Sequence, residues 1–300
     1  MSRGVSRIRM ALVAAAALAG ASALDMARAA TIRTPRAVVE FGEGDRSLAE
    51  AAPHVLESIR SELENELGLV GPELVCVRVS REARAFSGTI GGLPVELYAG
   101  MAYPSSGRIE INAASMDRPA RRTVFVRTLR HEYVHLAVGN TLRDKRLPKW
   151  FEEGLACAFG SPLPREDAAL VAGGRGYKLS ALVDRFPPSK DGLALAYAQS
   201  ESVVRYLVSR SSNRGIREVL RRVAAGRPFD AALEEATGFT TETLEESWRL
   251  RSRPSRFERT MRVIFGPGRV LLWTALFVVA GFFIVRHRRR RAAERLDDFV

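Results

Sequence analysis

Residues 126–140 read VRTLRHEYVHLAVGN and set two histidines, His131 and His135, four positions apart, with Glu132 directly after the first. On an α-helix, positions i and i+4 lie on one face, so both imidazoles can bind a single metal ion. The glutamate is displaced around the helix, where its carboxylate can reach a water molecule on that ion. The alternative is an ordinary amphipathic core helix, because neighbours such as Val134 are apolar. A third ligand would favour the metal site.

The residues that follow this motif offer a glutamate, and no nearby histidine, as that third ligand. Zinc in a hydrolytic site takes three protein ligands and leaves the fourth position open. In the pattern HExxHxxGxxH the third ligand is the final histidine. This chain has Val138 at the glycine position and Thr141 at the final histidine position. The next histidine is His287, beyond a long apolar run. Glu152 and Glu153 follow at a separation that suits a helix, a turn and a second helix packed alongside, so both are candidates.

A second motif lies in residues 147–159, LPKWFEEGLACAF. With Pro148, Trp150 and the Glu-Gly-Leu-Ala of residues 153–156, the chain resembles the peptidase-MA-like branch of the gluzincin zinc metallopeptidases. The similarity runs from about residue 46 to residue 250 and includes GMAYPSSGRIEIN at residues 100–112. The resemblance implies a zincin-like fold in which a glutamate on the second helix completes the metal site.

Residue by residue, the resemblance implies one zinc ion per chain, held by His131, His135 and Glu153. It implies that Glu132 is the general base, and that the neighbouring Glu152 faces elsewhere; Glu152 stays the alternative ligand. Trp150 is expected to be a packing residue.

Two further positions bear on catalysis. Hydrolysis of an amide develops negative charge on the carbonyl oxygen, which a positioned donor stabilises. Tyr197 falls in a Tyr-x-Gln motif that recurs in the family, so the resemblance suggests it as that donor; the alternative is a packing role.

Thermolysin-type enzymes carry an aspartate four residues after the ligand glutamate, where this chain has Cys157. The groups that orient the two histidines are therefore not predicted. Substrate is expected to lie extended beside an edge strand within residues 100–112.

The chain as a whole predicts an α+β fold with a β-containing N-terminal half, a helical C-terminal half and the His131 helix at their join. The expected C-terminal half is a helical subdomain, and the expected N-terminal half is a small mixed sheet with the active-site helix. Residues 31–43 are expected to form an extended lead-in. The expected strands are 73–80, 93–103 and 107–113, and the expected helices are 46–68, 117–138 (ended by Gly139 and Asn140), 148–159, 193–210, 215–226 and 241–251.

The N-terminus is typical of a secretory signal peptide, predicted here as residues 1–29. Three arginines precede an apolar run from Ala11 to Leu24, and Ala27 and Ala29 supply an A-x-A cleavage site. The alternative is a retained anchor, but the run is shorter than the roughly 20 residues that span a bilayer. We expect the domain of residues 31–262 to be exported.

The C-terminus predicts one transmembrane helix at residues 270–285, which carry no charge and are followed by RHRRRR. A buried core helix is the alternative, and the adjoining arginines argue against it. With an exported domain before it, this run stops transfer and leaves residues 286–300 as a basic cytoplasmic tail.

Composition and charge limit the partners. The 46% hydrophobic and 27% charged residues are those of a globular protein. Net charge is +12, of which +3 falls in residues 1–30 and +4 in residues 263–300, leaving +5 for the domain between them. That excess is mild and is not interleaved with aromatic residues, so no nucleic-acid partner is expected. Cys76 and Cys157 fit no cysteine metal site, and both a disulfide and two free thiols remain open.

Taken together, these features predict a membrane-anchored, extracytoplasmic zinc metallopeptidase that acts on a peptide or protein substrate. Two alternatives remain. One is a catalytically silent binding or scaffold protein of the cell envelope with a zincin fold. The other is a zinc hydrolase of non-peptide amides. The complete set of ligands and base favours the peptidase, because loss of Glu132 alone would silence the site.

Overall fold

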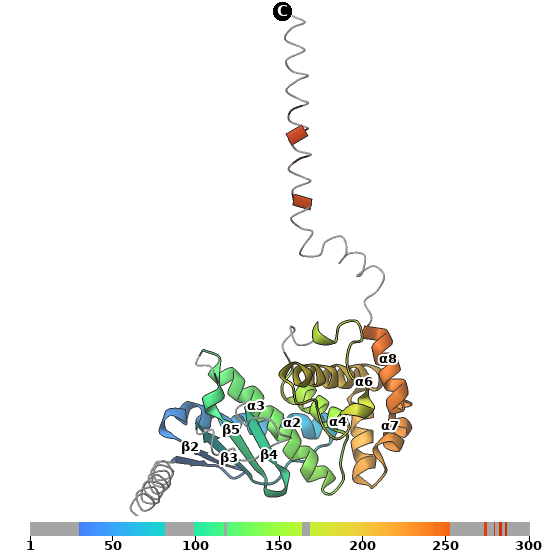
Figure 1. Ribbon diagram of the computed structural model, residues 1–300. Coiled ribbons are helices and arrows are strands. Elements are labelled where there is room, and N and C mark those ends of the chain that lie inside the picture. The colour runs from blue at the N-terminus through green and yellow to red at the C-terminus, as the bar shows by residue number, and fades with distance from the viewer. Residues whose placement is uncertain are drawn as a thin grey trace, which may run out of the picture. The chain divides into compact units, whose positions relative to one another are not determined.

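The computed structural model describes residues 30–81, 99–116, 119–163 and 169–252, with six separate positions between 273 and 286 (Figure 1). A sheet with two covering helices comes first in the chain, and a group of helices follows it. The expected α+β class, with strands in the N-terminal half and helices after them, is confirmed.

The sheet has five strands in the order β1-β2-β3-β5-β4. The three central strands run parallel, and each edge strand pairs antiparallel with its neighbour. Burial alternates along β2 and β3, because successive side chains of a strand point to opposite faces; β3 buries its three valines, and β2 buries Ala37, Val39 and Phe41. The strands are β1 (Ala30–Arg33), β2 (Ala37–Phe41), β3 (Val75–Ser80), β4 (Gly100–Tyr103) and β5 (Arg108–Asn112).

The N-terminal strands differ from the expectation of a single extended lead-in. Residues 31–43 contain most of β1 and all of β2, and β2 lies inside the sheet, parallel to β3. The short turn at residues 34–36 is closed by Thr34, whose backbone N–H donates to Ala37 O and whose hydroxyl accepts from Ala37 N. Of the strand expected at 93–103, residues 93–98 lie outside the described residues.

Two long helices contact the sheet and each other. Helix α2 (Arg46–Leu67) buries residues at helical spacing and ends at Gly68, whose φ of 69° suits a glycine and whose N–H caps Glu64 O. Helix α3 (Arg121–Leu142) carries the histidines and contacts β4 and β5.

Helix α3 does not end at Gly139 and Asn140, as the sequence suggested, but continues to Leu142. Gly139 instead lets α3 pack closely against Pro104, because a Cβ at this position would lie 2.3 Å from Pro104 Cβ. Arg143 ends the helix with a φ of 56°. The helix was expected to begin at residue 117, which lies outside the described residues, and α3 begins at Arg121.

The helical half begins with α4 (Lys149–Leu155), which continues as one wider π-helical turn, η6 (Ala156–Gly160). Helix α6 (Lys190–Ala224) covers the expected helix 193–210 and all but the last two residues of the expected helix 215–226, with non-helical Ser212 between them. Helix α7 (Phe229–Thr237) was not predicted, although Pro228 before it and Gly238 after it are ordinary boundary signals. Helix α8 (Thr241–Ser252) agrees with expectation, and its buried Trp248 donates its indole N–H to Ser202.

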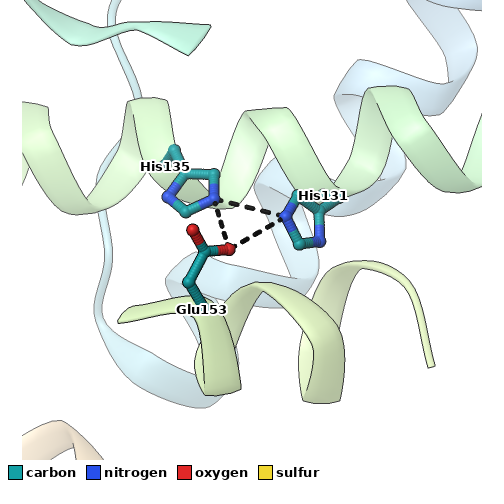
Figure 2. A group of neighbouring side chains, drawn as sticks. All are labelled: His131, His135 and Glu153. Carbon is teal, nitrogen blue, oxygen red and sulfur yellow. Dashed lines mark hydrogen bonds and ion pairs between the residues drawn. The ribbon is translucent and has the colours of Figure 1, made fainter. Parts of the chain in front are cut away.

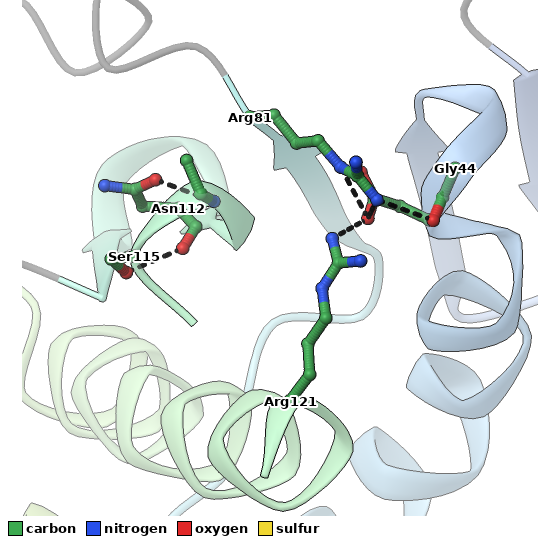
Figure 3. A network of polar contacts seen from close by, with 7 residues as sticks. Gly44, Arg81, Asn112, Ser115 and Arg121 are labelled. Atoms are coloured by element: carbon green, nitrogen blue, oxygen red, sulfur yellow. Dashed lines mark hydrogen bonds and ion pairs between the residues drawn. The ribbon is translucent and has the colours of Figure 1, made fainter. Parts of the chain in front are cut away.

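A charged cluster beyond the carboxyl ends of β2 and β3 joins the ends of three elements (Figure 3). Asp45 precedes α2 and is almost fully buried. Its carboxylate accepts hydrogen bonds from Arg81, which follows β3, and from Arg121, the first residue of α3. Arg81 also donates to Gly44 O at 2.9 Å. The cluster therefore fixes the start of the helix that bears the histidines.

Both cysteines are free thiols, Cys76 on β3 and Cys157 buried in η6. No helix among the described residues is both long enough and apolar enough to cross a membrane. The predicted signal peptide (1–29), most of the predicted span (270–285) and all but the first residue of the tail (286–300) lie outside those residues. The six separate positions are helical: Trp273, Thr274, Val279, Phe282, Phe283 and Arg286.

Candidate metal centre

Three side chains bring one donor atom each to a common point (Figure 2). His131 and His135 project from one face of α3 toward the Glu153 carboxylate on α4. The two Nε2 atoms lie 3.3 Å apart. Glu153 Oε2 lies 3.4 Å from Nε2 of His131 and 3.5 Å from Nε2 of His135. The three residues that the sequence singled out as ligands are thus neighbours in space.

These separations fit a tetrahedral zinc site. An ion bound at about 2.0–2.1 Å by tetrahedrally arranged donors holds those donors about 3.3 Å apart. In addition, Glu153 Oε2 is buried and has no hydrogen-bond partner, which is costly for a carboxylate oxygen unless a cation fills that place. Two imidazoles and one carboxylate are also a ligand set that zinc prefers. The residues present therefore fit the metal that the motif implies.

Glycines allow α4 to pack closely on α6 and the π-helical turn after it to pack closely on α3. A Cβ at Gly154 would lie 2.5 Å from both Ser200 O and Val204 Cγ2 of α6, so only glycine lets α4 settle there. A Cβ at Gly160 would lie 2.9 Å from His131 Cα, so the π-helical turn also needs glycine against α3. Beside Gly154, Trp150 is fully buried, in agreement with its expected packing role.

Glu152 and Glu153, the two candidate ligands, have different positions. Glu152 Oε1 lies 2.8 Å from Nδ1 of His135, on the far side of the ring from the donor atoms. A carboxylate that accepts the Nδ1 proton leaves the Nε2 lone pair free for a metal. Glu152 is thus an orienting partner of His135 that the sequence could not name.

The charges at the site favour a cation between the rings and the carboxylate. Burial alone would raise the pKa of Glu153, but the His135 charge, the nearby ring nitrogens of both histidines and the Lys149 ammonium hold it well below the usual range. Burial alone would lower the pKa of His135, but the Glu153 and Glu152 carboxylates raise it well above the usual range. A metal ion would supply the positive charge that these carboxylates attract.

Glu132, the candidate base, is a buried carboxyl beside the donor atoms. Burial raises its pKa, while the neighbouring His131 and His135 and a hydrogen bond from the Ala102 backbone oppose that rise. Strand β4 can approach because Gly100 has no side chain; a Cβ there would lie 2.9 Å from Glu132 Cγ. The carboxylate is therefore positioned by the backbone of an edge strand.

The donor atoms lie in a cavity of about 1080 Å³. Strand β4, from Gly100 to Ala102, lines one part, and residues Asp184–Pro188 line another. Tyr197 lines it as well, with its ring centroid 6.4 Å from that of His131 and 5.2 Å from that of Phe186. The tyrosine suggested by the Tyr-x-Gln motif therefore lies beside a ligand histidine.

A second tyrosine in the cavity, Tyr177, escaped the sequence analysis because it belongs to no motif. Its hydroxyl lies against the first turn of α6, where it would be 3.0 Å from a Cβ at Gly192. Its backbone is held by the fully buried Gln199 amide, which accepts from Tyr177 N at 2.7 Å and donates to Tyr177 O at 2.8 Å. The Tyr-x-Gln motif thus contributes two residues to the cavity. Tyr197 lines it, and Gln199 holds the backbone of Tyr177 in place by two hydrogen bonds.

Cys157 stands four residues after Glu153, at the position where thermolysin-type enzymes carry an aspartate. It is buried, and burial, together with the charges of Glu153 and Glu201, raises the pKa of its thiol well above the usual range. A neutral thiol there cannot act as a carboxylate, so the orienting carboxylate of this site is Glu152, one residue before the ligand.

Comparison with known families agrees with this geometry. The family model described as "Peptidase MA superfamily" matches residues 64–252, which is more than half of the chain. No curated protein matches the chain.

Proposed function

Because this chain belongs to the peptidase MA superfamily, we propose that it is a gluzincin-type zinc metallopeptidase that hydrolyses peptide bonds. The observation that carries the proposal is the convergence of His131 Nε2, His135 Nε2 and Glu153 Oε2 beside the buried carboxyl of Glu132. The family supplies the metallopeptidase-like fold, and the side chains of this chain supply the ligands and the base.

In the proposed reaction, His131, His135 and Glu153 hold the zinc ion, and Glu132 moves the proton. Bound zinc would polarise the scissile carbonyl and acidify the attacking water. Glu132 accepts a proton from that water and then delivers it to the leaving amine. Its raised pKa suits both steps, because a carboxylate with a higher proton affinity is a better base at neutral pH.

The remaining cavity residues orient the substrate. Among the described residues β4 is an edge strand, so its backbone groups, apart from the Ala102 donor to Glu132, can pair with an extended peptide. Tyr197, beside His131, is the proposed donor to the carbonyl oxygen as its negative charge develops.

We further propose that the catalytic domain is extracytoplasmic and is held by a C-terminal anchor. The support is the basic and apolar start of the chain and the uncharged run at 270–285 before RHRRRR. The described apolar side chains within that run, Trp273, Val279, Phe282 and Phe283, are exposed, as lipid contact requires. Protease accessibility of intact and permeabilised spheroplasts, with epitope tags on either side of the run, tests this orientation.

The catalytic proposal is tested with the purified full-length chain, loaded with zinc and incubated with a mixed peptide library. Glu132→Gln is the matched variant, because it keeps the shape of the side chain and removes the base. Wild type should cleave peptides, and the variant should bind zinc equally but cleave at least about 100-fold more slowly. Equal cleavage by both chains would refute the assigned mechanism, and cleavage by neither would favour a silent protein.

A further inference from the structure

The two oxygens of the Glu153 carboxylate have different partners. Oε2 faces the histidine nitrogens, at 3.4 and 3.5 Å. Oε1 instead accepts a hydrogen bond from the ammonium of Lys149, at 3.1 Å. Lys149 stands one helical turn before Glu153 and opens α4. One oxygen is therefore available to a metal, and the other is held by a cation of the protein.

Lys149 is itself fixed from several sides. Its backbone N–H donates to Val183 O at 2.7 Å, which ties the start of α4 to the cavity wall. Its Nζ lies 5.4 Å from the centre of the Phe186 ring, within range of a cation–π contact. The side chain lines the cavity and is only partly exposed. The ammonium is therefore positioned between the carboxylate and an aromatic side chain and is not a freely moving surface charge.

The number of oxygens that Glu153 gives to the metal has a chemical consequence. A carboxylate can bind an ion through one oxygen or through both, and binding through both would fill the position that a catalytic zinc site leaves open for water. The Lys149 ammonium on Oε1 disfavours a bond from Oε1 to the metal. Such a bond would cost the oxygen its charge-assisted hydrogen bond, and it would bring the ammonium and the metal ion closer together.

We propose that Lys149 is a positioning residue that keeps Glu153 a one-oxygen ligand and so preserves the open position of the metal site. In this role it acts through Glu153. The proposal rests on the metal centre of the proposed function. Its rival is a plain i,i+4 ion pair that supports α4 and has no effect on the metal.

The experiment uses the full-length chain with Co²⁺ in place of zinc, because the visible spectrum of Co²⁺ distinguishes four-coordinate from five-coordinate sites. The variants are Lys149→Met, which keeps the length and removes the charge, and Lys149→Arg, which keeps a donor. Lys145→Met is the control, because Lys145 pairs with the exposed Asp144 and does not line the cavity.

Lys149→Met should show the weaker, five-coordinate Co²⁺ spectrum, whereas Lys149→Arg and Lys145→Met should resemble wild type. Zinc affinity, measured by competition with a chromophoric chelator, should rise about tenfold in Lys149→Met, because a neighbouring positive charge has gone. Its kcat should nevertheless fall by at least about tenfold, with KM nearly unchanged. Tighter metal binding with slower turnover is a combination that a merely structural ion pair would not produce.

An unchanged Co²⁺ spectrum in Lys149→Met, or a loss of zinc affinity together with thermal stability, would overturn the positioning role and leave the proposed function intact. Failure of wild type to bind Co²⁺ or zinc at all would overturn both. Metal binding by wild type without peptide cleavage would refute only the peptidase, because the spectrum and the affinity still report on Lys149.

Discussion

Replacement of Gly154 by alanine should harm both the fold and the metal site, because the new methyl group has no space. An ideal Cβ at this position lies 2.5 Å from Ser200 O and from Val204 Cγ2, and the first of these is backbone that cannot rotate away. Overpacking of this kind costs about 1–3 kcal/mol. Alanine recovers up to about 1 kcal/mol through its higher helix propensity. The net loss should be about 1–2 kcal/mol, which lowers Tm by about 2–8 °C in a domain of this size.

The same displacement should weaken zinc binding, because α4 must move away from α6 and Glu153 moves with it. Outer contacts that orient a ligand are worth about 10–100-fold in metal affinity, so we expect a loss of about tenfold. Thermal unfolding of the metal-free full-length chain and chelator competition measure the two effects separately.

Gly42→Ala is the matched control. Its φ of −77° suits any residue, and a Cβ there would meet nothing within 4 Å. It should leave zinc affinity unchanged and raise stability slightly, by about 0.4–1 kcal/mol. If Gly154→Ala melted and bound zinc like wild type, the claim that this glycine sets the packing of α4 against α6, and with it the position of Glu153, would be wrong.

Three further predictions concern the charged groups and the metal. Asp45→Asn should lower stability by about 1–3 kcal/mol in denaturant titrations, because two arginines lose a buried carboxylate; an unchanged midpoint would contradict this. The Arg130 hydrogen bond lowers the pKa of Glu62, so the ionised pair stabilises the fold above about pH 4.5 and the contribution is lost as pH falls through the lowered pKa. Glu62→Gln should therefore melt below wild type at pH 7, and the difference should shrink in acid; a constant difference would argue against the linkage. Zinc at about 100 times its Kd should raise Tm by about 5–10 °C, and the rise should be absent in His131→Ala.

The clustering of His131, His135 and Glu153 and the fold class could be predicted from the sequence because they depend largely on local spacing. His131 and His135 share a helix face by the geometry of the helix alone. A glutamate was expected because no third histidine follows nearby, and Glu153 was chosen over Glu152 because the WFEEGLA motif resembles that of the peptidase-MA family. Both arguments use residues that lie within one pair of adjacent helices.

What could not be predicted depends on contacts between distant segments. Gly139 looked like a helix terminator, yet it is required by Pro104, 35 positions earlier in the chain. Glu152 could be weighed as a ligand but not recognised as the partner of His135 Nδ1, since that depends on how α4 is turned against α3. The place of β2 inside the sheet depends on its pairing with β3, which its own residues do not encode.

The most direct test of the account is the zinc content of three full-length chains after dialysis against a weak chelator. Wild type and Glu132→Gln should each retain one zinc ion per chain, whereas Glu153→Ala should retain almost none, because it lacks the third donor. Full zinc retention by Glu153→Ala, or none by wild type, would contradict the central claim that His131, His135 and Glu153 form the metal site.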